Sequence, residues 1–220
     1  SVARLGLLLL SPTCARFTSN FVMLIPNVIQ PGSVDQNHMV TTLDFTPTIL
    51  EATKLPAIPN IDGRSFLPAL KGVKMTGWDH VFTVYNSAFG NNWLPMRCMR
   101  TRDHSYIWNA WSNGTKKYQT ENMAGLTWDA MTAAAKKNPA IKERTEFYTH
   151  RTPEEFYNLN NDPYERNNLI KSADSQAEIE SMRKQLLTMM QSTDDPFANA
   201  FANRDNKELI QEAIKKHQKA

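Results

Sequence analysis

The residue types that could do chemistry are present in this chain, but they stand apart from one another. The sequence contains no H-E-x-x-H helix, no paired Cys-x-x-Cys, no G-x-S-x-G elbow and no glycine-rich phosphate loop. The five histidines are isolated in the same way: His38, His80, His104, His150 and His217. A lone histidine is most often a surface or structural residue. The sequence therefore predicts no self-contained catalytic centre.

Two carboxylates have a spacing that could suit a cation. Asp44 and Glu51 lie seven positions apart in a predicted helix, which is close to two turns and places them on one face. A solvated or capping role is the better interpretation of such a pair. The cysteines, Cys14 and Cys98, are far apart in the sequence and lack a metal-ligand spacing.

The composition is that of a globular protein rather than a disordered one. Of the 220 residues, 41% are hydrophobic and 21% are charged, which is enough to build a core. The net charge is only +3, from 25 basic and 22 acidic residues, and the basic residues are scattered. No face is typical of a phosphate-binding stripe, so nucleic acid is not expected as a partner.

The first twenty residues are atypical. Arg4 precedes the run Leu5–Leu10, and small residues follow around Ala15, which resembles a short signal peptide. The run is too short for a transmembrane helix, which needs about 20 apolar residues. Two other interpretations stay open: a truncated gene start, and a buried strand detached from its partners.

Hydrophobic periodicity and chain-breaking residues predict alternating strands and helices. Strands are expected at 21–32, at 80–86, over a hairpin at 96–111 that bends at 102–104, and at 155–160 before a turn at 162–163. Helices are expected at 40–56, 126–138 and 174–195, with a short helical turn at 63–72 and a weakly amphipathic tail at 206–220. The strand at 21–32 has few visible partners, which suggests that a larger sheet extends beyond this stretch.

Two predicted helices carry start signals. Thr46 can cap the helix at 40–56, with Pro47 in its first position. Asp174 or Ser175 can cap the helix at 174–195, with Glu178 placed to complete a capping box. One face of that helix is apolar at three- and four-residue steps: Ile179, Met182, Leu186, Leu187 and Met190.

Three segments together resemble the sulfatase family, and their order and spacing agree with it over residues 21–196. They are VTTLDFTPTILEATKLP with GRSFLPALKG (40–56 and 63–72), MRCMRTRDHSYIWN (96–109), and EEFYNLNNDPYERNNLI (154–170). The last is similar to the family's E-L-Y-D-L-x-x-D-P-x-E-x-x-N-L signature. Within the family, Leu94-Pro95-Met96-Arg97 and a long insert at 117–146 resemble the N-sulfoglucosamine sulfohydrolase (heparan sulfamidase) group.

The resemblance implies an α+β fold, the C-terminal part of an alkaline-phosphatase-like sulfatase. It would contain a small antiparallel sheet packed by a long helix, together with a remnant strand and helix of the large α/β domain. The implied division of the chain is an atypical segment at 1–20, the large-domain remnant at 21–75, a C-terminal subdomain at 76–196 and a charged helical tail at 197–220.

In the resembled family, hydrolysis relies on a formylglycine nucleophile, made from the C-x-P-S-R motif, and on a bound calcium ion. The segment SPTCAR (11–16) does not match that motif, because Arg16 stands where proline is required. The resemblance therefore assigns no catalytic residue and no metal ligand to this chain, and it implies an upstream catalytic domain as partner. A periplasmic, extracellular or lysosomal location is expected on the same ground.

The resemblance also suggests which residues face a sulfated sugar. The predicted loop 86–97 would lie at the mouth of the sulfate pocket, with Asn91, Asn92, Trp93 and Arg97 offering amide, stacking and cationic contacts. An ordinary loop with a buried tryptophan and a structural arginine is the alternative. Ser87, Ala88 and Phe89 stand where related sulfamidases carry histidine and acidic residues, so the exact substrate stays open.

Two functions from different classes follow from these patterns. The first is the C-terminal portion of a sulfatase that acts on sulfate esters or N-sulfates of sugars, with phosphonate or phosphate monoesters as a variant. The second is a non-catalytic module that binds sulfated glycans or a protein partner. The segment 154–170 is expected to fasten the subdomain together, through strand residues Phe156, Tyr157 and Leu159, with Asn167 or Asn168 satisfying open backbone and Leu169 anchoring the next helix.

Overall fold

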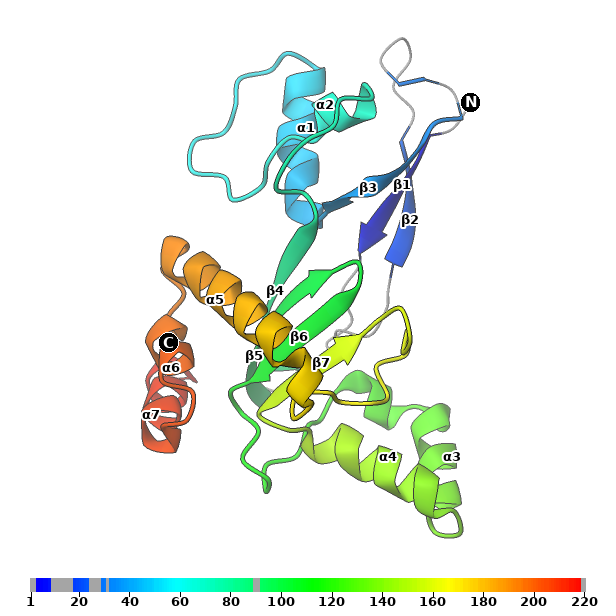
Figure 1. Ribbon diagram of the computed structural model, residues 1–220, viewed down its shortest axis with the longest axis vertical. Helices are drawn as coiled ribbons and strands as arrows, with labels where there is room; N and C mark the ends of the chain where they lie inside the picture. The colour runs from blue at the N-terminus through cyan, green and yellow to red at the C-terminus, as the bar shows by residue number, and fades with distance from the viewer. Residues whose placement is uncertain (1–2, 9–17, 24–28, 31, 89–91, 219–220) are drawn as a thin grey trace. The chain divides into compact units, whose positions relative to one another are not determined.

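The computed structural model describes residues 3–8, 18–23, 29–30, 32–88 and 92–218 (Figure 1). The chain divides into two compact units. The first unit comprises residues 1–81, 100–104 and 159–165, and the second unit comprises residues 82–99, 105–158 and 166–220. The boundaries expected from the sequence at residues 20, 75 and 196 stay predictions.

The first unit contains a three-stranded sheet in the order β2-β1-β3. Its strands are β1 (Ala3–Leu8), β2 (Thr18–Met23) and β3 (Val34–Val40). Strand β1 pairs antiparallel with β2 and parallel with β3. The strand predicted at 21–32 is confirmed only at its start, where it belongs to β2, and much of the remainder lies outside the described residues. The N-terminal segment thus supplies the partner strand that the sequence pattern did not reveal.

A short helical layer follows this sheet: the 3-10 turn η1 (Thr42–Asp44), α1 (Phe45–Ala52) and α2 (Leu67–Leu70). The predicted cap at Thr46 is wrong, because the helix has already begun before Pro47. Asp44 does the capping instead: its Oδ2 accepts from the backbone N–H of Thr41 at 2.8 Å and from its hydroxyl at 3.0 Å. The other oxygen of Asp44 accepts from the Arg64 N–H at 2.9 Å. Of the two roles considered for this carboxylate, cation binding and capping, the structure shows capping.

Gly63 allows the 53–64 connection to lie against the start of this layer. A Cβ at position 63 would stand 2.0 Å from the carbonyl oxygen of Leu43, closer than any real side chain contact. Phe66 and Trp78 then complete a small core, in which the ring of Phe66 meets those of Phe45 and Trp78 edge to face. The segment 63–72 therefore has a packing role in the first unit.

The second unit is built on a four-stranded antiparallel sheet in the order β4-β5-β6-β7 (Figure 1). Its strands are β4 (His80–Ala88), β5 (Asn92–Thr101), β6 (His104–Asn109) and β7 (Glu154–Asn158). The predicted hairpin at 96–111 and the strand before the 162–163 turn are confirmed. The predicted loop 86–97 is wrong over most of its length, because both of its ends continue as strand.

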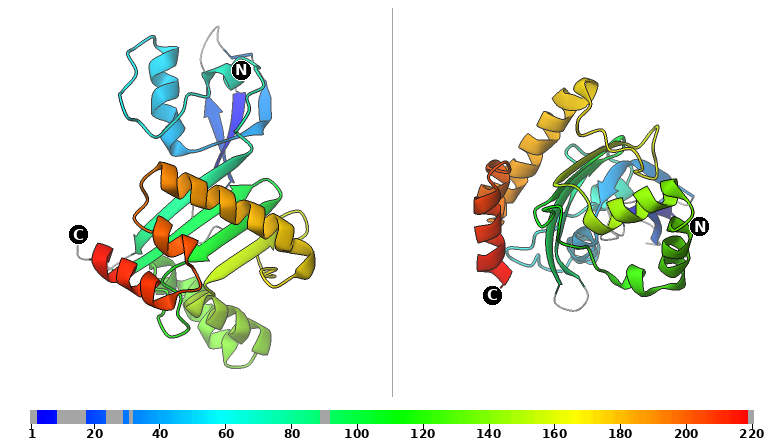
Figure 2. Two further views of the ribbon diagram at one scale, coloured as in Figure 1. Left: turned by 60° about the vertical axis from the view of Figure 1, so that its left-hand side comes forward. Right: turned by 90° about the horizontal axis from the view of Figure 1, so that it is seen from below.

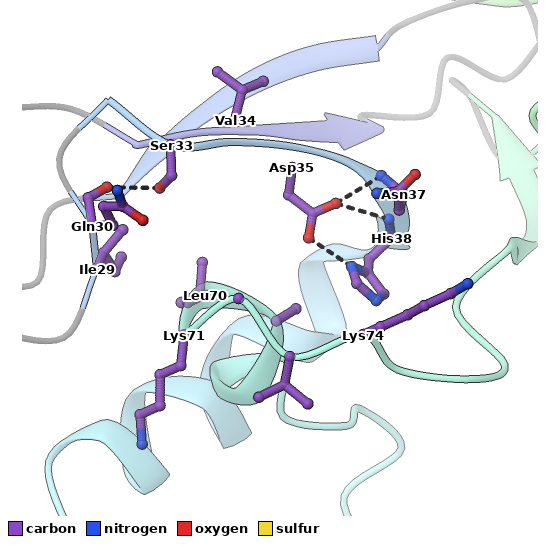
Figure 3. Close-up of a pocket in the computed structure, with 13 residues that line it drawn as sticks. Ile29, Gln30, Ser33, Val34, Asp35, Asn37, His38, Leu70, Lys71 and Lys74 are labelled. Atoms are coloured by element: carbon purple, nitrogen blue, oxygen red, sulfur yellow. Dashed lines mark hydrogen bonds and ion pairs between the residues drawn. The ribbon is translucent and has the colours of Figure 1, made fainter.

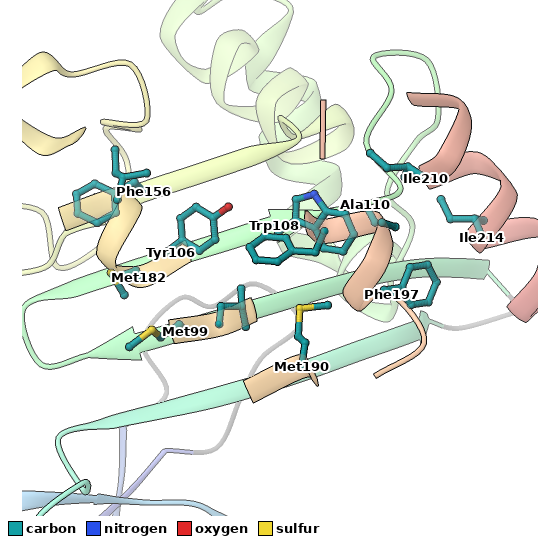
Figure 4. Packing of buried hydrophobic residues seen from close by; sticks show 14 residues of the cluster. Met99, Tyr106, Trp108, Ala110, Phe156, Met182, Met190, Phe197, Ile210 and Ile214 are labelled. Carbon is teal, nitrogen blue, oxygen red and sulfur yellow. The ribbon is translucent and has the colours of Figure 1, made fainter. Parts of the chain in front are cut away.

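Side chains alternate along these strands, so the sheet has two different faces. The α5 face carries Met99, Tyr106, Trp108 and Phe156, which pack against α5 (Gln176–Ser192), α6 (Ala198–Ala202) and α7 (Lys207–Gln218) (Figure 4). On the α4 face, sheet residues pack with the rings of Tyr118 and Tyr148. Figure 2 shows α5, α6 and α7 on one side of the sheet, and α3 (Leu126–Ala135) and α4 (Pro139–His150) on the other.

Helix α5 matches the prediction in position and in its apolar face. Ile179, Met182, Leu186 and Met190 are fully buried, and Leu187 packs at the edge of the same cluster. The predicted cap is confirmed in position only: Ser175 is the N-cap residue of α5, but its side chain makes no capping bond, and the 3-10 turn η4 (Ala173–Ser175) leads into the helix.

The predicted tail is a real element of the core, since Ile210 and Ile214 of α7 are buried. Helix α3 is confirmed, whereas α4 was not foreseen although Asn138 caps it, with Oδ1 accepting from Ala140 and Ile141 N–H, and Pro139 opens it. In the described part of the chain, no helix is both long and apolar enough to cross a membrane.

We expect truncation of Leu186 to destabilise the second unit far more than truncation of its neighbour. Leu186→Ala leaves a cavity beneath α5 and should lower the free energy of unfolding by about 2–5 kcal/mol. Leu187→Ala, at the edge of the cluster, should cost clearly less. Urea unfolding followed by tryptophan fluorescence measures both, and equal losses would contradict the assignment of the buried face.

Candidate functional site

The residues predicted to face a sugar lie at the start of β5 and along it. Asn91 lies outside the described residues, and Asn92 opens the strand. Trp93 and Arg97 are four positions apart and point to the α5 face, where Trp93 packs at the edge of the main core. The indole N–H of Trp93 is buried with no hydrogen-bond partner among the described residues. The structure thus brings two of the four predicted residues onto one face.

Arg97 is anchored within the second unit. Its side chain is 1% exposed, and it forms a forked ion pair with Asp195, with Nε to Oδ2 at 2.5 Å and Nη2 to Oδ1 at 2.9 Å. Nη1 donates to the side-chain oxygen of Asn86 at 2.9 Å, and the guanidinium lies over the ring of Phe197. This geometry fits the alternative of a structural arginine that joins β4, β5 and the end of α5. A substrate contact by Arg97 stays a prediction.

A different cation lies beside Trp93. The ammonium of Lys116 donates to the backbone oxygen of Trp93 at 2.6 Å, and the side chain is only partly buried. Burial lowers the pKa of Lys116 from its ordinary value. An ammonium has three N–H donors, and this contact uses one of them. The sequence did not single out Lys116, since the neighbouring Lys117 gives the same local signal.

On the α4 face, a buried charge pair closes the turn between α4 and β7. Glu155 is 0% exposed and accepts two bonds from Arg151, at 2.7 and 2.5 Å. Asn109 Nδ2 and the hydroxyl of Tyr157 also donate to this carboxylate, at 2.7 and 2.6 Å. Burial alone would lower the pKa of Arg151, but the carboxylate of Glu155 outweighs it and raises that pKa above its ordinary value. Arg151 therefore stays charged, and the group is structural.

The segment 154–170 fastens the sheet to α5, as predicted. Of the two asparagines considered, Asn168 makes the contacts shown: its side-chain oxygen accepts from the backbone N–H of Phe156 and of Ile170, both at 3.0 Å. Its amide donates to the hydroxyl of Thr152 at 3.2 Å. Leu169 then packs against the α5-face core and donates its N–H to the Phe156 carbonyl at 2.8 Å.

A pocket of about 340 Å³ lies in the first unit beside β3 and α2 (Figure 3). His38 is held on both ring nitrogens: Nδ1 lies 2.6 Å from Asp35 Oδ2, and Nε2 accepts the Met75 N–H at 2.9 Å. The imidazole therefore carries its proton on Nδ1 and has no nitrogen left for a substrate. Figure 3 shows the ammonium groups of Lys71 and Lys74 pointing in opposite directions. These groups do not converge on one ligand.

The described residues do not form the ligand set that a calcium ion needs. Calcium takes six to eight oxygen ligands, with several carboxylates among them. In the described ranges, no three histidine, cysteine, aspartate or glutamate side chains gather in a way that could hold a metal ion. The carboxylates that are close together, such as Glu154 and Glu180, are bound to arginines.

Comparison with known proteins finds sulfatases that share this fold. Residues 15–120 match the model of the N-sulphoglucosamine sulphohydrolase C-terminal region. An ulvan-active sulfatase of Formosa agariphila is 27% identical over 177 residues, which is 80% of this chain and 33% of that protein. A 2-O GAG sulfatase structure superimposes with a TM-score of 0.56 at 19% identity, over 82% of this chain and 31% of that one.

A structure solved in complex with its substrate D-glucosamine-2-N,6-O-disulfate gives a TM-score of 0.54 at 17% identity, over 86% of this chain and 30% of that one. The architecture is therefore the α+β C-terminal part of an alkaline-phosphatase-like sulfatase. The chain is similar to sulfatases in sequence and in fold, and it spans about a third of the length of these relatives. The predicted likeness to N-sulfoglucosamine sulfohydrolase is confirmed by the family match.

We expect the Arg97–Asp195 pair to be essential for stability. Arg97→Met leaves a buried carboxylate without its cation and should cost about 3–5 kcal/mol of unfolding free energy. The double variant Arg97→Met with Asp195→Leu should recover most of that loss, because no unpaired charge remains.

Lys142→Met is the matched control, since the Lys142–Glu146 pair is exposed and 3.8 Å apart. Its effect should stay below about 1 kcal/mol. Thermal and urea unfolding measure all three variants. If Arg97→Met costs no more than the control, the ion pair does not hold the sheet to the end of α5.

Proposed function

We propose that this chain is the C-terminal portion of a sulfatase that hydrolyses sulfate ester or N-sulfate groups of sugars. The match of residues 15–120 to the N-sulphoglucosamine sulphohydrolase C-terminal region is the observation that supports it most directly. The relatives named above support the sugar as substrate class, since one is ulvan-active, one is a 2-O GAG sulfatase and one was solved with a disulfated glucosamine.

In this proposal the chemical step belongs to a preceding catalytic domain. A formylglycine hydrate there supplies the nucleophile, and a calcium ion offsets the negative charge of the sulfate. The second unit of this chain would present a rigid sheet edge to the sugar. Rigidity is supported by the buried ion pair of Arg97 with Asp195, which ties β5 to the end of α5.

Lys116 would provide the cationic contact that the sequence placed on Arg97. The ammonium of Lys116 is positioned by the Trp93 carbonyl and keeps donors for an anionic group, whereas the donors of Arg97 are engaged inside the unit. Asn91, Asn92 and Trp93 stay proposed sugar contacts.

The coding sequence that precedes Ser1 tests the proposal. We expect it to encode C-x-P-S-R in frame, and the longer product to hydrolyse a chromogenic aryl sulfate in the presence of calcium. Replacing the motif cysteine by alanine should abolish turnover. The 220-residue chain alone, assayed at equal concentration, should give none. Calcium-dependent turnover by the chain alone, or no turnover by the longer product, would count against the proposal.

We expect Lys116→Ala in the longer product to raise KM for a sulfated sugar by about tenfold with little change in kcat. Charge-assisted hydrogen bonds contribute about 1.5–3 kcal/mol, and the lower end of that range corresponds to roughly a tenfold loss. Lys117→Ala, which removes the same charge from the exposed neighbouring position, is the control and should change KM by less than about twofold. Steady-state kinetics measure both, and equal effects would remove Lys116 from the site.

A further inference from the structure

A second pocket, of about 590 Å³, lies within the second unit at the end of β6. Its walls come from three places that are distant in sequence: residues 108–114 at the end of β6 and in the turn after it, residues 153–154 at the start of β7, and residues 204–211 around the start of α7. Figure 4 shows Trp108 and Ala110 beside Ile210 of α7. The volume suits a ligand the size of one sugar residue rather than a single small ion.

Two cations of this pocket retain hydrogen-bond donors. Arg204 approaches the carboxylates of Glu154 and Glu180 only at 3.5 and 3.9 Å, longer than close hydrogen bonds. Lys207 is exposed in the first turn of α7, where the helix dipole adds positive potential. A planar guanidinium next to a flexible ammonium is suited to a tetrahedral anion such as a sulfate group.

Asn113 presents a third donor because its oxygen is already used. That oxygen accepts from the N–H and the hydroxyl of Thr115, both at 3.0 Å, and from the N–H of Lys116 at 2.8 Å. Gly114, with φ of 85°, closes this tight turn. The side-chain NH₂ of Asn113 is therefore the part of the amide that is left to meet a ligand at the pocket wall.

The lining of the pocket carries two carboxylates, Glu154 and Asp205, beside its two cations. Glu154 is bound by Arg183, with Nε at 2.8 Å and Nη2 at 2.6 Å, and by the hydroxyl of Tyr106. Arg183 does not line the pocket, and it pairs with Glu180 as well. The charges of the lining are therefore balanced, and a ligand would be recognised through the hydrogen-bond donors of Arg204, Lys207 and Asn113 rather than through a net positive charge.

The rest of the lining fits a sugar ring. Pro153 and the edge of Ile210 supply apolar surface for its C–H face, and Gln211 adds an amide. We propose that this pocket binds one sulfated sugar residue of a glycan chain, with Arg204, Lys207 and Asn113 as donors to the sulfate. The site rests on the proposed function, because it would hold a further residue of the same class of polymer.

Calorimetric titration of the 220-residue chain with a heparin-derived hexasaccharide at about 150 mM salt tests the pocket. Asn113→Asp is the sharpest variant, since it keeps the oxygen that the turn requires and replaces the donor by a negative charge. We expect it to weaken binding by tenfold or more, and Arg204→Gln with Lys207→Gln to do the same. Lys215→Gln, an exposed lysine of α7 outside the pocket, should change Kd by less than twofold.

Three comparison ligands separate the sources of affinity. The desulfated hexasaccharide, an unsulfated polyuronate oligomer and inorganic sulfate should each bind at least tenfold more weakly. Equal binding of the polyuronate, or of inorganic sulfate, would overturn the sulfated-sugar assignment. Equal Kd values for Asn113→Asp and Lys215→Gln would overturn the pocket itself. Because binding is measured without turnover, a failure here is distinct from a failure of the longer product to hydrolyse aryl sulfate.

Discussion

The burial of one sheet face beneath α5 is the constraint on which the second unit depends. Residues of a strand alternate between two faces, so once Tyr106, Trp108 and Phe156 are committed to the α5 core, their neighbours must point the other way. These neighbours include the buried polar residues Ser105, Asn109 and Glu155, together with the apolar Ile107. The opposite face therefore mixes buried polar groups with apolar and aromatic ones.

Buried polar groups on that second face need partners, and the chain provides them in closed sets. Glu155 receives four donors, from Arg151 twice, Asn109 and Tyr157. In the first unit, Arg100 and Glu165 form a comparable buried pair at 2.8 Å. A buried ion pair adds little net stability over an apolar replacement, but its geometry favours one arrangement of the elements that carry it. The pairs Arg100–Glu165 and Arg97–Asp195 join segments that are far apart along the chain, whereas Arg151–Glu155 fixes a local turn.

In the second unit, the cations whose hydrogen-bond donors are engaged are therefore different residues from the cations that keep donors for a ligand. Arg97 and Arg151 have their donors engaged within it, whereas Lys116, Arg204 and Lys207 keep donors at or near the surface. A protein that handles sulfated sugars needs cations of the second kind, because the anion must meet donors that are not already bound. The proposed contacts use these three residues, while the buried arginines pair with carboxylates inside the unit.

The sequence by itself determined the family, the order of most strands and helices, and the fastening role of 154–170, because these depend on local periodicity and on contiguous motifs. It also predicted the buried face of α5 from its three- and four-residue spacing. Tertiary structure alone decided which cations are available. Arg97 and Lys116 look alike in a sequence, and only packing shows that one meets the carboxylate of Asp195 from a residue 98 positions away while the other meets a single carbonyl. The bond from the Arg64 N–H to Asp44, and the pocket made by residues 108–114 and 204–211, likewise depend on contacts between distant segments, which no local pattern records.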